Sequence, residues 1–271
     1  MKKMKHIIAV LFSALLALKP AMAQDTKITE ENHDQAMEQM FPEAAMDIKT
    51  IGILVYDGFF SLDAIGPMAV LSELMGTQVF FIGLEKGLVS NSQMKIQVDK
   101  SIDEVEALDM LLVPGGAQET FKMTQNEEVL EWIRKIDKTT TITASVCTGA
   151  WILGEAGLLE GRKASTHWYR AEEMLKRYGA EHQNQRYTID GKYWTSAGVT
   201  AGMDMSLALI QKIRGNTYLE AAMLDLEYAP QPPINAGIPE KSSKEAVDMM
   251  LAMYDMGLQP LIKEADAKKK K

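Results

Sequence analysis

Residues 141–154 read TITASVCTGAWILG and give the clearest indication of the fold. Thr141–Val146 is a short apolar run typical of a buried strand, and Thr148–Ala156 has the spacing of a helix. Cys147 lies where the two meet, which is the elbow arrangement that presents a nucleophile in α/β enzymes. Gly149 leaves room for the sharp turn. The alternative is a buried structural cysteine that packs as a small hydrophobic residue.

The same alternation of strands and helices extends on both sides of this stretch. Apolar runs predict further strands at Ile51–Tyr56, Val79–Leu84 and Met110–Val113, and a hairpin at Tyr187–Asp190 and Lys192–Ser196 that turns at Asp190-Gly191. Helical spacing is found at Ala64–Met75, Asn126–Ile136, Val199–Ile213, Thr217–Glu227 and Lys244–Met256. The pattern indicates an α/β fold, a doubly wound and mostly parallel sheet with helices on both faces.

Residues suited to chemistry follow three of the predicted strands. Asp63 follows the first strand, Gly115-Gly116 the third and Cys147 the fourth. In open α/β sheets the ligand crevice lies at the carboxyl ends of the strands, so we expect these residues to converge on one site. The helix that starts after Cys147 is expected to stabilise the thiolate and to lower the pKa of the thiol.

The N-terminal residues have the pattern of a targeting segment. Residues 1–23 combine a lysine-rich start, an apolar run and the small-x-small sequence Ala21-Met22-Ala23, as in a cleavable secretory signal peptide. The predicted location is therefore periplasmic or secreted, with a retained N-terminal anchor as the alternative. We expect residues 24–49 to form a polar tether, 50–260 the α/β domain and 261–271 a charged tail.

Composition excludes several classes of protein. The formal charge is −8, and removal of residues 1–23, with four lysines and no acidic residue, would make it more negative by four units. An acidic surface repels phosphate backbones, so nucleic acid is not an expected partner. The single cysteine excludes an internal disulfide framework. No spacing of ligating residues suggests a metal, and no cofactor is expected.

The body of the chain, from about residue 50 to 239, resembles the PfpI-type, class I glutamine-amidotransferase-like superfamily. The matching stretches are IGILVYDGFFSLDAIGP, LLVPGG, SVCTGAWILGEAGLLEGRKASTHW, SAGVTAGMD and LEYAPQPPINAG. The Leu-Asp-x-x-Gly-Pro and Ser-Val-Cys-Thr-Gly runs look most like the isonitrile hydratase branch, which shares them with the ligand-binding halves of AraC-type regulators. The resemblance implies a flavodoxin-like fold with a nucleophile elbow and a homodimer.

The resemblance also implies roles for particular residues. Cys147 matches the nucleophile, and Asp63 the acidic residue that hydrogen-bonds its sulfur. Gly116 and Thr148 match positions whose backbone N–H groups point into an anion-stabilising pocket, and His167 a histidine near the cysteine. PfpI-type proteases carry a histidine directly after the cysteine. Here that residue is Thr148, so peptidase activity is not expected.

Each of these residues also has a structural interpretation. Asp63 directly precedes a predicted helix and is suited to cap it, whereas burial would raise the pKa of its carboxyl and keep a proton on it. His167 could bond only to backbone at the end of a short strand. Gly115-Gly116 could be loop residues, although after Pro114 they would let amides approach a bound anion.

Three functions therefore compete at the sequence level. The first is a hydratase or lyase on a small-molecule substrate, in which Cys147 attacks an isonitrile carbon, Asp63 protonates the neighbouring nitrogen and water releases an N-formamide. The second is a small-molecule binder or thiol redox sensor. The 32 residues after Pro239 leave no room for the DNA-binding region of a regulator. The third is glyoxalase, deglycase or chaperone activity. No stable membrane insertion is expected after cleavage.

Overall fold

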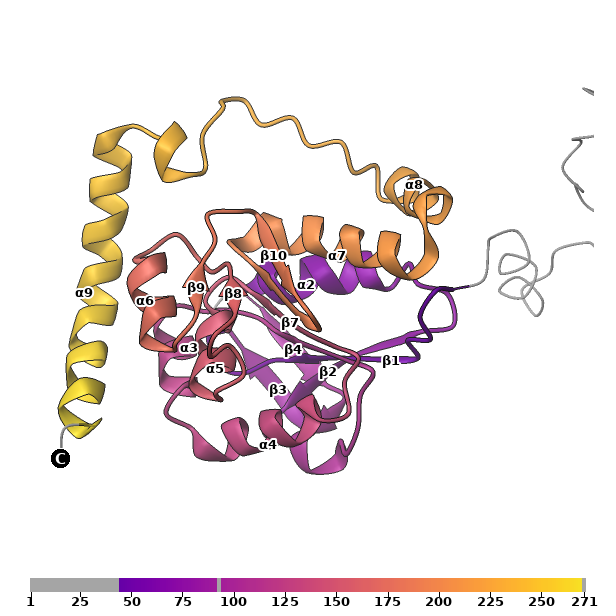
Figure 1. Ribbon diagram of the computed structural model, residues 1–271, viewed down its shortest axis with the longest axis horizontal. Helices are drawn as coiled ribbons and strands as arrows, with labels where there is room; N and C mark the ends of the chain where they lie inside the picture. Colours follow the sequence, from indigo (N-terminus) through magenta and orange to yellow (C-terminus); the bar gives the residue numbers. More distant parts are fainter. Residues whose placement is uncertain (1–43, 92–93, 270–271) are drawn as a thin grey trace, which may run out of the picture. The chain divides into compact units, whose positions relative to one another are not determined.

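The central sheet has seven strands in the order β10-β11-β7-β6-β1-β2-β5, in a computed structural model that describes residues 44–91 and 94–269 (Figure 1). Its strands are β1 Thr50–Leu54, β2 Gln78–Gly83, β5 Lys100–Ser101, β6 Met110–Val113, β7 Ile142–Val146, β10 Tyr187–Asp190 and β11 Tyr193–Ser196. All neighbours run parallel except β10 and β11, which form an antiparallel hairpin. The predicted doubly wound sheet is therefore confirmed.

Helices cover both faces of this sheet. They are α2 Ser61–Leu71, α3 Gln118–Met123, α4 Glu127–Asp137, α5 Gly149–Glu155, α6 Ala171–Arg177, α7 Val199–Arg214, α8 Asn216–Asp225 and α9 Lys244–Lys269. Figure 1 shows α2 and α7 side by side on one face and α4 and α5 on the other. Strands β6 and β7 lie between the two layers, and every residue of both is buried. This burial on both faces explains their unbroken apolar sequence.

Two small strand pairs lie outside the central sheet. The hairpin of β3 Gly87–Ser90 and β4 Lys95–Val98 is antiparallel, and β8 Lys163–Ala164 pairs in parallel with β9 Glu181–His182. The sequence analysis did not predict them, nor the short helices α3 and α6. Unlike β6 and β7, which are equally short, these elements lack an unbroken apolar run that would make them stand out.

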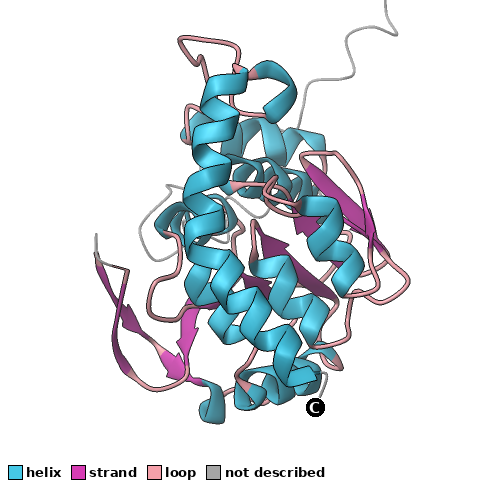
Figure 2. Cartoon of the chain, turned by 90° about the vertical axis from the view of Figure 1, so that its left-hand side faces the viewer, coloured by secondary structure: helices cyan, strands magenta, loops and turns pink. Residues whose placement is uncertain are grey.

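The C-terminal helix is longer than the sequence indicated. Residues 261–271 were expected as a charged tail, but α9 continues through Lys269, with Ile262 and Ala265 buried. Gly257 and Pro260 favour an earlier end, and packing of the apolar face against the domain overrides them. Figure 2, which views the molecule from the side of α9, shows this helix in the foreground.

The predicted N-terminal segments are only partly within the described residues. The signal peptide, 1–23, and the tether up to residue 43 lie outside them. The end of the tether belongs to the fold, because Ile48 is buried in the core and the Ala45 N–H donates to the Ile213 carbonyl at 2.7 Å. No helix within residues 44–91 and 94–269 combines the length and apolar character needed to cross a membrane.

Candidate active site

Cys147 occupies the elbow between β7 and α5, as predicted. Its backbone φ of 59° lies in the left-handed region, which costs a non-glycine residue about 1–2 kcal/mol. Two contacts hold it there: the Cys147 N–H donates to the Ser196 carbonyl at 3.1 Å, and Thr166 Oγ1 donates to the Cys147 carbonyl at 2.9 Å. Only glycine fits at position 149, because a Cβ there would lie 2.1 Å from the Val113 carbonyl oxygen.

Asp63 lies within the first turn of α2, with its side chain fully buried. Phe60 is the N-cap residue of that helix, so the interpretation of Asp63 as a cap is wrong. Asp63 Oδ2 instead accepts a hydrogen bond of 3.0 Å from the Gly115 N–H, while Oδ1 is buried without a hydrogen bond of normal geometry. The carboxyl is therefore held on one side only and turns its other oxygen to an unsatisfied position.

The thiol and the carboxyl influence each other's ionisation. Burial raises the pKa of Asp63 to about 7, against smaller opposite effects of hydrogen bonds from the Gly115 N–H and the Cys147 thiol. Burial and the charge of Asp63 raise the pKa of Cys147 well above its usual value, although hydrogen bonds from Thr148 act to lower it. The prediction of a low-pKa cysteine is therefore wrong. The pair rests as a neutral thiol beside a carboxyl that titrates near neutrality.

Of the three backbone N–H groups expected in an anion pocket, that of Thr148 hydrogen-bonds Cys147, but those of Gly115 and Gly116 do not face a ligand. The Gly115 N–H donates to Asp63, and the Gly116 N–H donates to Thr148 Oγ1 at 3.1 Å. Thr148 Oγ1 also accepts from the Ala117 N–H at 3.2 Å. Both glycine amides thus bind side chains of the protein, so their role is to position Asp63 and Thr148. The close packing explains the first glycine, because a Cβ at Gly115 would lie 2.6 Å from Thr148 Oγ1.

His167 is buried near the elbow, and its interpretation as a backbone-bonded residue fits the structure. Its Nδ1 accepts a hydrogen bond of 3.3 Å from the Tyr169 N–H, and its Nε2 lies 3.5 Å from the Tyr254 hydroxyl. Burial lowers the pKa of His167 to about 4, so the ring is neutral at pH 7. Both ring nitrogens face partners other than Cys147, and His167 is therefore not its base.

Three residues that the sequence analysis did not single out belong to this region. Tyr56, just after β1, donates to the Pro114 carbonyl at 2.8 Å, and its hydroxyl lies 2.9 Å from Thr120 Oγ1. Thr148 Oγ1 donates to the same Thr120 oxygen at 3.0 Å. The pKa of Tyr254, on α9, is raised by burial and further by the nearby Cys147 and Asp63. Its place beyond the last strand gave no signal in the sequence.

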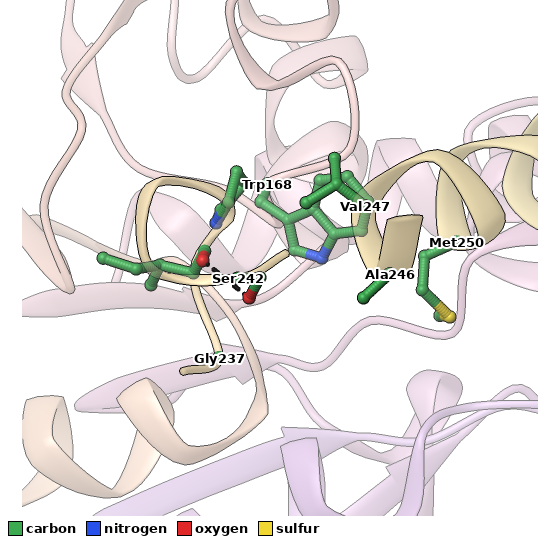
Figure 3. A pocket seen from close by; sticks show the side chains of 8 residues that line it. Trp168, Gly237, Ser242, Ala246, Val247 and Met250 are labelled. Atoms are coloured by element: carbon green, nitrogen blue, oxygen red, sulfur yellow. Dashed lines mark hydrogen bonds between the residues drawn. The ribbon is translucent and has the colours of Figure 1, made fainter. Parts of the chain in front are cut away.

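A pocket of about 180 Å³ lies beside this region. Its lining is mostly apolar and includes Trp168, Ile238, Pro239, Val247 and Met250, and Figure 3 shows the Trp168 ring beside Val247. Neither Cys147 nor Asp63 lines it. The Trp168 ring lies 5.5 Å from the His167 ring and 5.9 Å from the Tyr254 ring, measured between centroids. Trp168 is thus shared by the pocket and the aromatic residues around the elbow.

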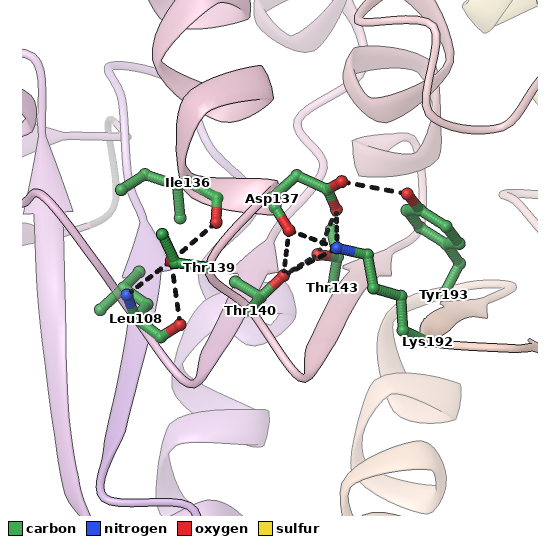
Figure 4. A network of polar contacts seen from close by, with 8 residues as sticks. All are labelled: Leu108, Ile136, Asp137, Thr139, Thr140, Thr143, Lys192 and Tyr193. Carbon is green, nitrogen blue, oxygen red and sulfur yellow. Dashed lines mark hydrogen bonds and ion pairs between the residues drawn. The ribbon is translucent and has the colours of Figure 1, made fainter.

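A second buried carboxyl, Asp137, lies at the opposite end of β7. Its Oδ1 accepts from Thr143 Oγ1 at 2.7 Å and pairs with Lys192 Nζ at 3.0 Å, and its Oδ2 accepts from the Tyr193 hydroxyl at 3.0 Å (Figure 4). Thr140 Oγ1 lies 2.7 Å from Thr143 Oγ1 and extends the network. Both oxygens of this carboxylate have partners, including a cation, so we assign the network to stability.

Comparison with known proteins agrees with this geometry. The chain is 35% identical over 199 residues to an isonitrile hydratase of Pseudomonas putida, which covers 73% of this chain and 86% of that protein. It is 32% identical over 149 residues to a deglycase of Thermococcus kodakarensis, covering 54% of this chain and 87% of the deglycase. A crystal structure of a ThiJ/PfpI family protein from Pseudomonas syringae superimposes with a TM-score of 0.77 at 29% identity, over 90% of this chain and 98% of that one.

The family model that matches is that of the DJ-1/PfpI family, and it spans residues 49–212. This range contains the elbow, Asp63, both glycines and His167, and it ends before α8 and α9. The fold, the elbow cysteine and the matched range agree, and the chain belongs to the DJ-1/PfpI family.

Proposed function

We propose that this protein is a cysteine-dependent hydratase that adds water to an isonitrile and releases an N-formamide. The observation that carries the proposal is the buried pair of Cys147 and Asp63, a thiol beside a carboxyl whose pKa is about 7. The similarity to an isonitrile hydratase supports the same reaction class. Because the pKa of the Cys147 thiol is raised, a base must remove its proton. Asp63 can be this base, because its carboxyl is ionised above its pKa of about 7.

In the proposed reaction one proton moves from the Cys147 thiol through Asp63 to the substrate. As Sγ of Cys147 bonds to the terminal carbon of the isonitrile, the thiol proton passes to the Asp63 carboxylate and from there to the substrate. In the resulting thioimidate, R–N=CH–S–Cys147, that proton is on the carbon, not on the nitrogen as in the mechanism expected from the sequence. Water then bonds to the same carbon, one of its protons ends on nitrogen, the other returns to sulfur, and the C–S bond breaks.

The direct test is hydration of an alkyl isonitrile by the whole chain, followed by the appearance of N-formamide. Wild type should turn the substrate over and Cys147→Ala should not, because the alanine variant cannot form the covalent intermediate. Tyr193→Phe, at the other end of the sheet, is a matched control that removes a buried hydroxyl without touching the pair. Equal turnover by wild type and Cys147→Ala would refute covalent catalysis by this cysteine.

A deglycase or glyoxalase reaction is the second candidate, and the deglycase relative is the observation that favours it. Assay of glyoxals and peptides beside the isonitrile separates the candidates by substrate class. A thiol redox sensor is less favoured, because reactivity toward oxidants follows the thiolate and burial raises the pKa of Cys147.

Export and dimer formation are proposals that rest on the sequence. The pattern of residues 1–23 supports export, and protein from the envelope fraction should then begin at Gln24. The homodimer is implied only by the resemblance to the PfpI-type superfamily. One mature chain has a mass of roughly 27 kDa, typical of a domain of this size. Light scattering should give twice this mass.

A further inference from the structure

The C-terminal helix α9 is attached to the family domain by a defined apolar stripe. Tyr254, Leu258, Ile262 and Ala265 recur at helical spacing and therefore share one face. That face packs in a second apolar cluster, separate from the main core, with Phe121, Trp151, Tyr169, Met174 and Tyr178. The helix begins 32 residues after the matched family range ends, so it lies outside the part of the fold that the family model covers.

Polar contacts fix the rotation and register of α9 on this surface. Asp255 Oδ1 accepts from the Tyr169 hydroxyl at 2.7 Å and pairs with Arg170 at 3.0 Å. About three turns further on, Asp266 pairs with Arg177. Gly257 makes the close approach possible, because a Cβ there would overlap the Gln118 side chain. The position of Tyr254 is thus set by the contact of the adjacent Asp255 and by further contacts toward the C-terminal end of the helix.

The Tyr254 ring lies over the residues that follow the elbow. Its centroid is 5.0 Å from the His167 ring and 5.2 Å from the Tyr169 ring. Since His167 is neutral and its Nδ1 accepts from the Tyr169 N–H, the ring proton is on Nε2 and is directed to the Tyr254 oxygen 3.5 Å away. The Tyr254 hydroxyl keeps its own proton and one lone pair for another partner.

Tyr254 is also the solvent-side member of the group around the thiol. Cys147 and Asp63 lie close enough to Tyr254 and Tyr56 to influence their ionisation, although burial is the larger cause of the raised pKa of both tyrosines, and Thr148 hydrogen-bonds the sulfur. Asp63, Thr148 and Tyr56 are buried, whereas Tyr254 is only partly buried. Of these four side chains, Tyr254 is therefore the one that solvent can reach.

We propose that Tyr254 is a positioning residue that orients the water molecule for attack on the covalent intermediate at Cys147. This inference rests on the proposed hydratase function. The Tyr254 oxygen, already bonded to His167, accepts one proton of the water, which directs the water oxygen toward the thioimidate carbon. Tyr254 gains and loses no proton over the cycle. The water protons end on nitrogen and sulfur as described above, and the first step, attack of sulfur on the isonitrile, does not involve Tyr254.

The test compares wild type with Tyr254→Phe, which keeps the ring and its packing and removes only the hydroxyl. A misplaced water should slow the second step by about 10²-fold. Rapid quench followed by intact-protein mass spectrometry should then show the thioimidate on Cys147 at nearly full occupancy, with the adduct forming at the wild-type rate. Tyr193→Phe is the control for loss of a buried tyrosine hydroxyl, and it should keep wild-type kcat with no adduct accumulating.

The outcomes distinguish the role of Tyr254 from the proposed hydratase function. If wild type hydrates the isonitrile and Tyr254→Phe keeps its kcat, or loses adduct formation and turnover together, the role of Tyr254 is overturned and the hydratase function stands. If wild type forms neither adduct nor formamide, the proposed function fails, and this inference fails with it. A lower unfolding temperature of Tyr254→Phe alone does not produce an accumulating adduct, so a structural role is distinguished from a positioning role.

Discussion

Asp63 and Asp137 are buried aspartates at opposite ends of the same sheet, and they differ in how fully their carboxylate oxygens are hydrogen-bonded. Asp137 has a cation, two hydroxyls and both oxygens occupied. Asp63 has one backbone N–H on Oδ2, an unsatisfied Oδ1 and a pKa raised to about 7. The fold gives both oxygens of Asp137 a partner at one end of the sheet. At the other end, where the cysteine lies, it leaves Oδ1 of Asp63 without one. The difference marks the second end as the place of chemistry.

The largest expected effect is on turnover. Asp63→Asn keeps the size of the side chain and an acceptor for the Gly115 N–H but cannot carry a proton, so kcat/KM should fall by about 10²- to 10⁴-fold. Asp137→Asn should leave kcat/KM within about twofold, because its partners all lie at the far end of β7 and β11. Steady-state assay of both variants checks the contrast. A similar loss in both variants would contradict it.

Stability should change in opposite directions in the same two variants. The folded-state pKa of Asp63 is raised, so its carboxyl favours folding below the ordinary pKa, and this contribution is lost as pH rises through about 7. At pH 8 Asp63→Asn removes a buried unsatisfied charge and should stabilise the fold by about 1–4 kcal/mol. Asp137→Asn weakens a satisfied pair that is partly open to solvent at Lys192, and should destabilise by about 1–3 kcal/mol.

Urea unfolding at pH 8 and pH 5 measures both changes. The gain from Asp63→Asn should shrink at pH 5, where the wild-type carboxyl is protonated and no longer unfavourable. Destabilisation by Asp63→Asn at pH 8 would show that the carboxylate is better satisfied than its contacts with the Gly115 N–H and the Cys147 thiol indicate.

The pH dependence of turnover should report the pair as a unit. The active form carries one proton, on the thiol, with Asp63 ionised. Hence kcat/KM should rise as pH increases through about 7, when Asp63 loses its proton, and should fall only well above pH 9, when the thiol ionises. A profile that is already flat at pH 5 would indicate a thiolate nucleophile of low pKa. In Asp63→Asn the rise of kcat/KM through about pH 7 should be absent.

The smallest expected effect concerns backbone strain, which is found at the Cys147 end. Cys147 has a positive φ that glycine adopts freely, so Cys147→Gly should be more stable than Cys147→Ala by about 1 kcal/mol. Thermal unfolding of the two inactive variants isolates this term, since both lose the thiol. Equal stability would mean that the hydrogen bonds to Ser196 and Thr166 hold the elbow without strain.

The sheet and the elbow were predictable because their residues repeat a strong local pattern. The apolar runs of β6 and β7 predict buried strands. Cys147, two residues before Gly149, predicts a sharp turn at the end of β7. The convergence of Asp63 and Cys147 also followed from strand order, and their closeness is confirmed by their mutual effects on pKa.

The remaining features of the site depend on contacts between distant parts of the chain. The direction of the Cys147 pKa was missed because burial outweighs the helix N-terminus, and burial is a property of the whole fold. The Gly116 amide was expected to face a ligand, but the Thr148 hydroxyl 32 positions away takes its hydrogen bond. Tyr254 approaches the elbow only because α9 docks through side chains of α3, α5 and α6.

The proposed mechanism requires that Asp63 titrates near neutrality and carries the proton for Cys147. It is tested most directly by infrared difference spectroscopy of wild type against Asp63→Asn, which isolates the carboxyl band of this one residue as pH is varied. The account predicts that the protonated carboxyl signal disappears with a midpoint near pH 7. A midpoint below pH 5, in the ordinary range of an aspartate, would contradict it.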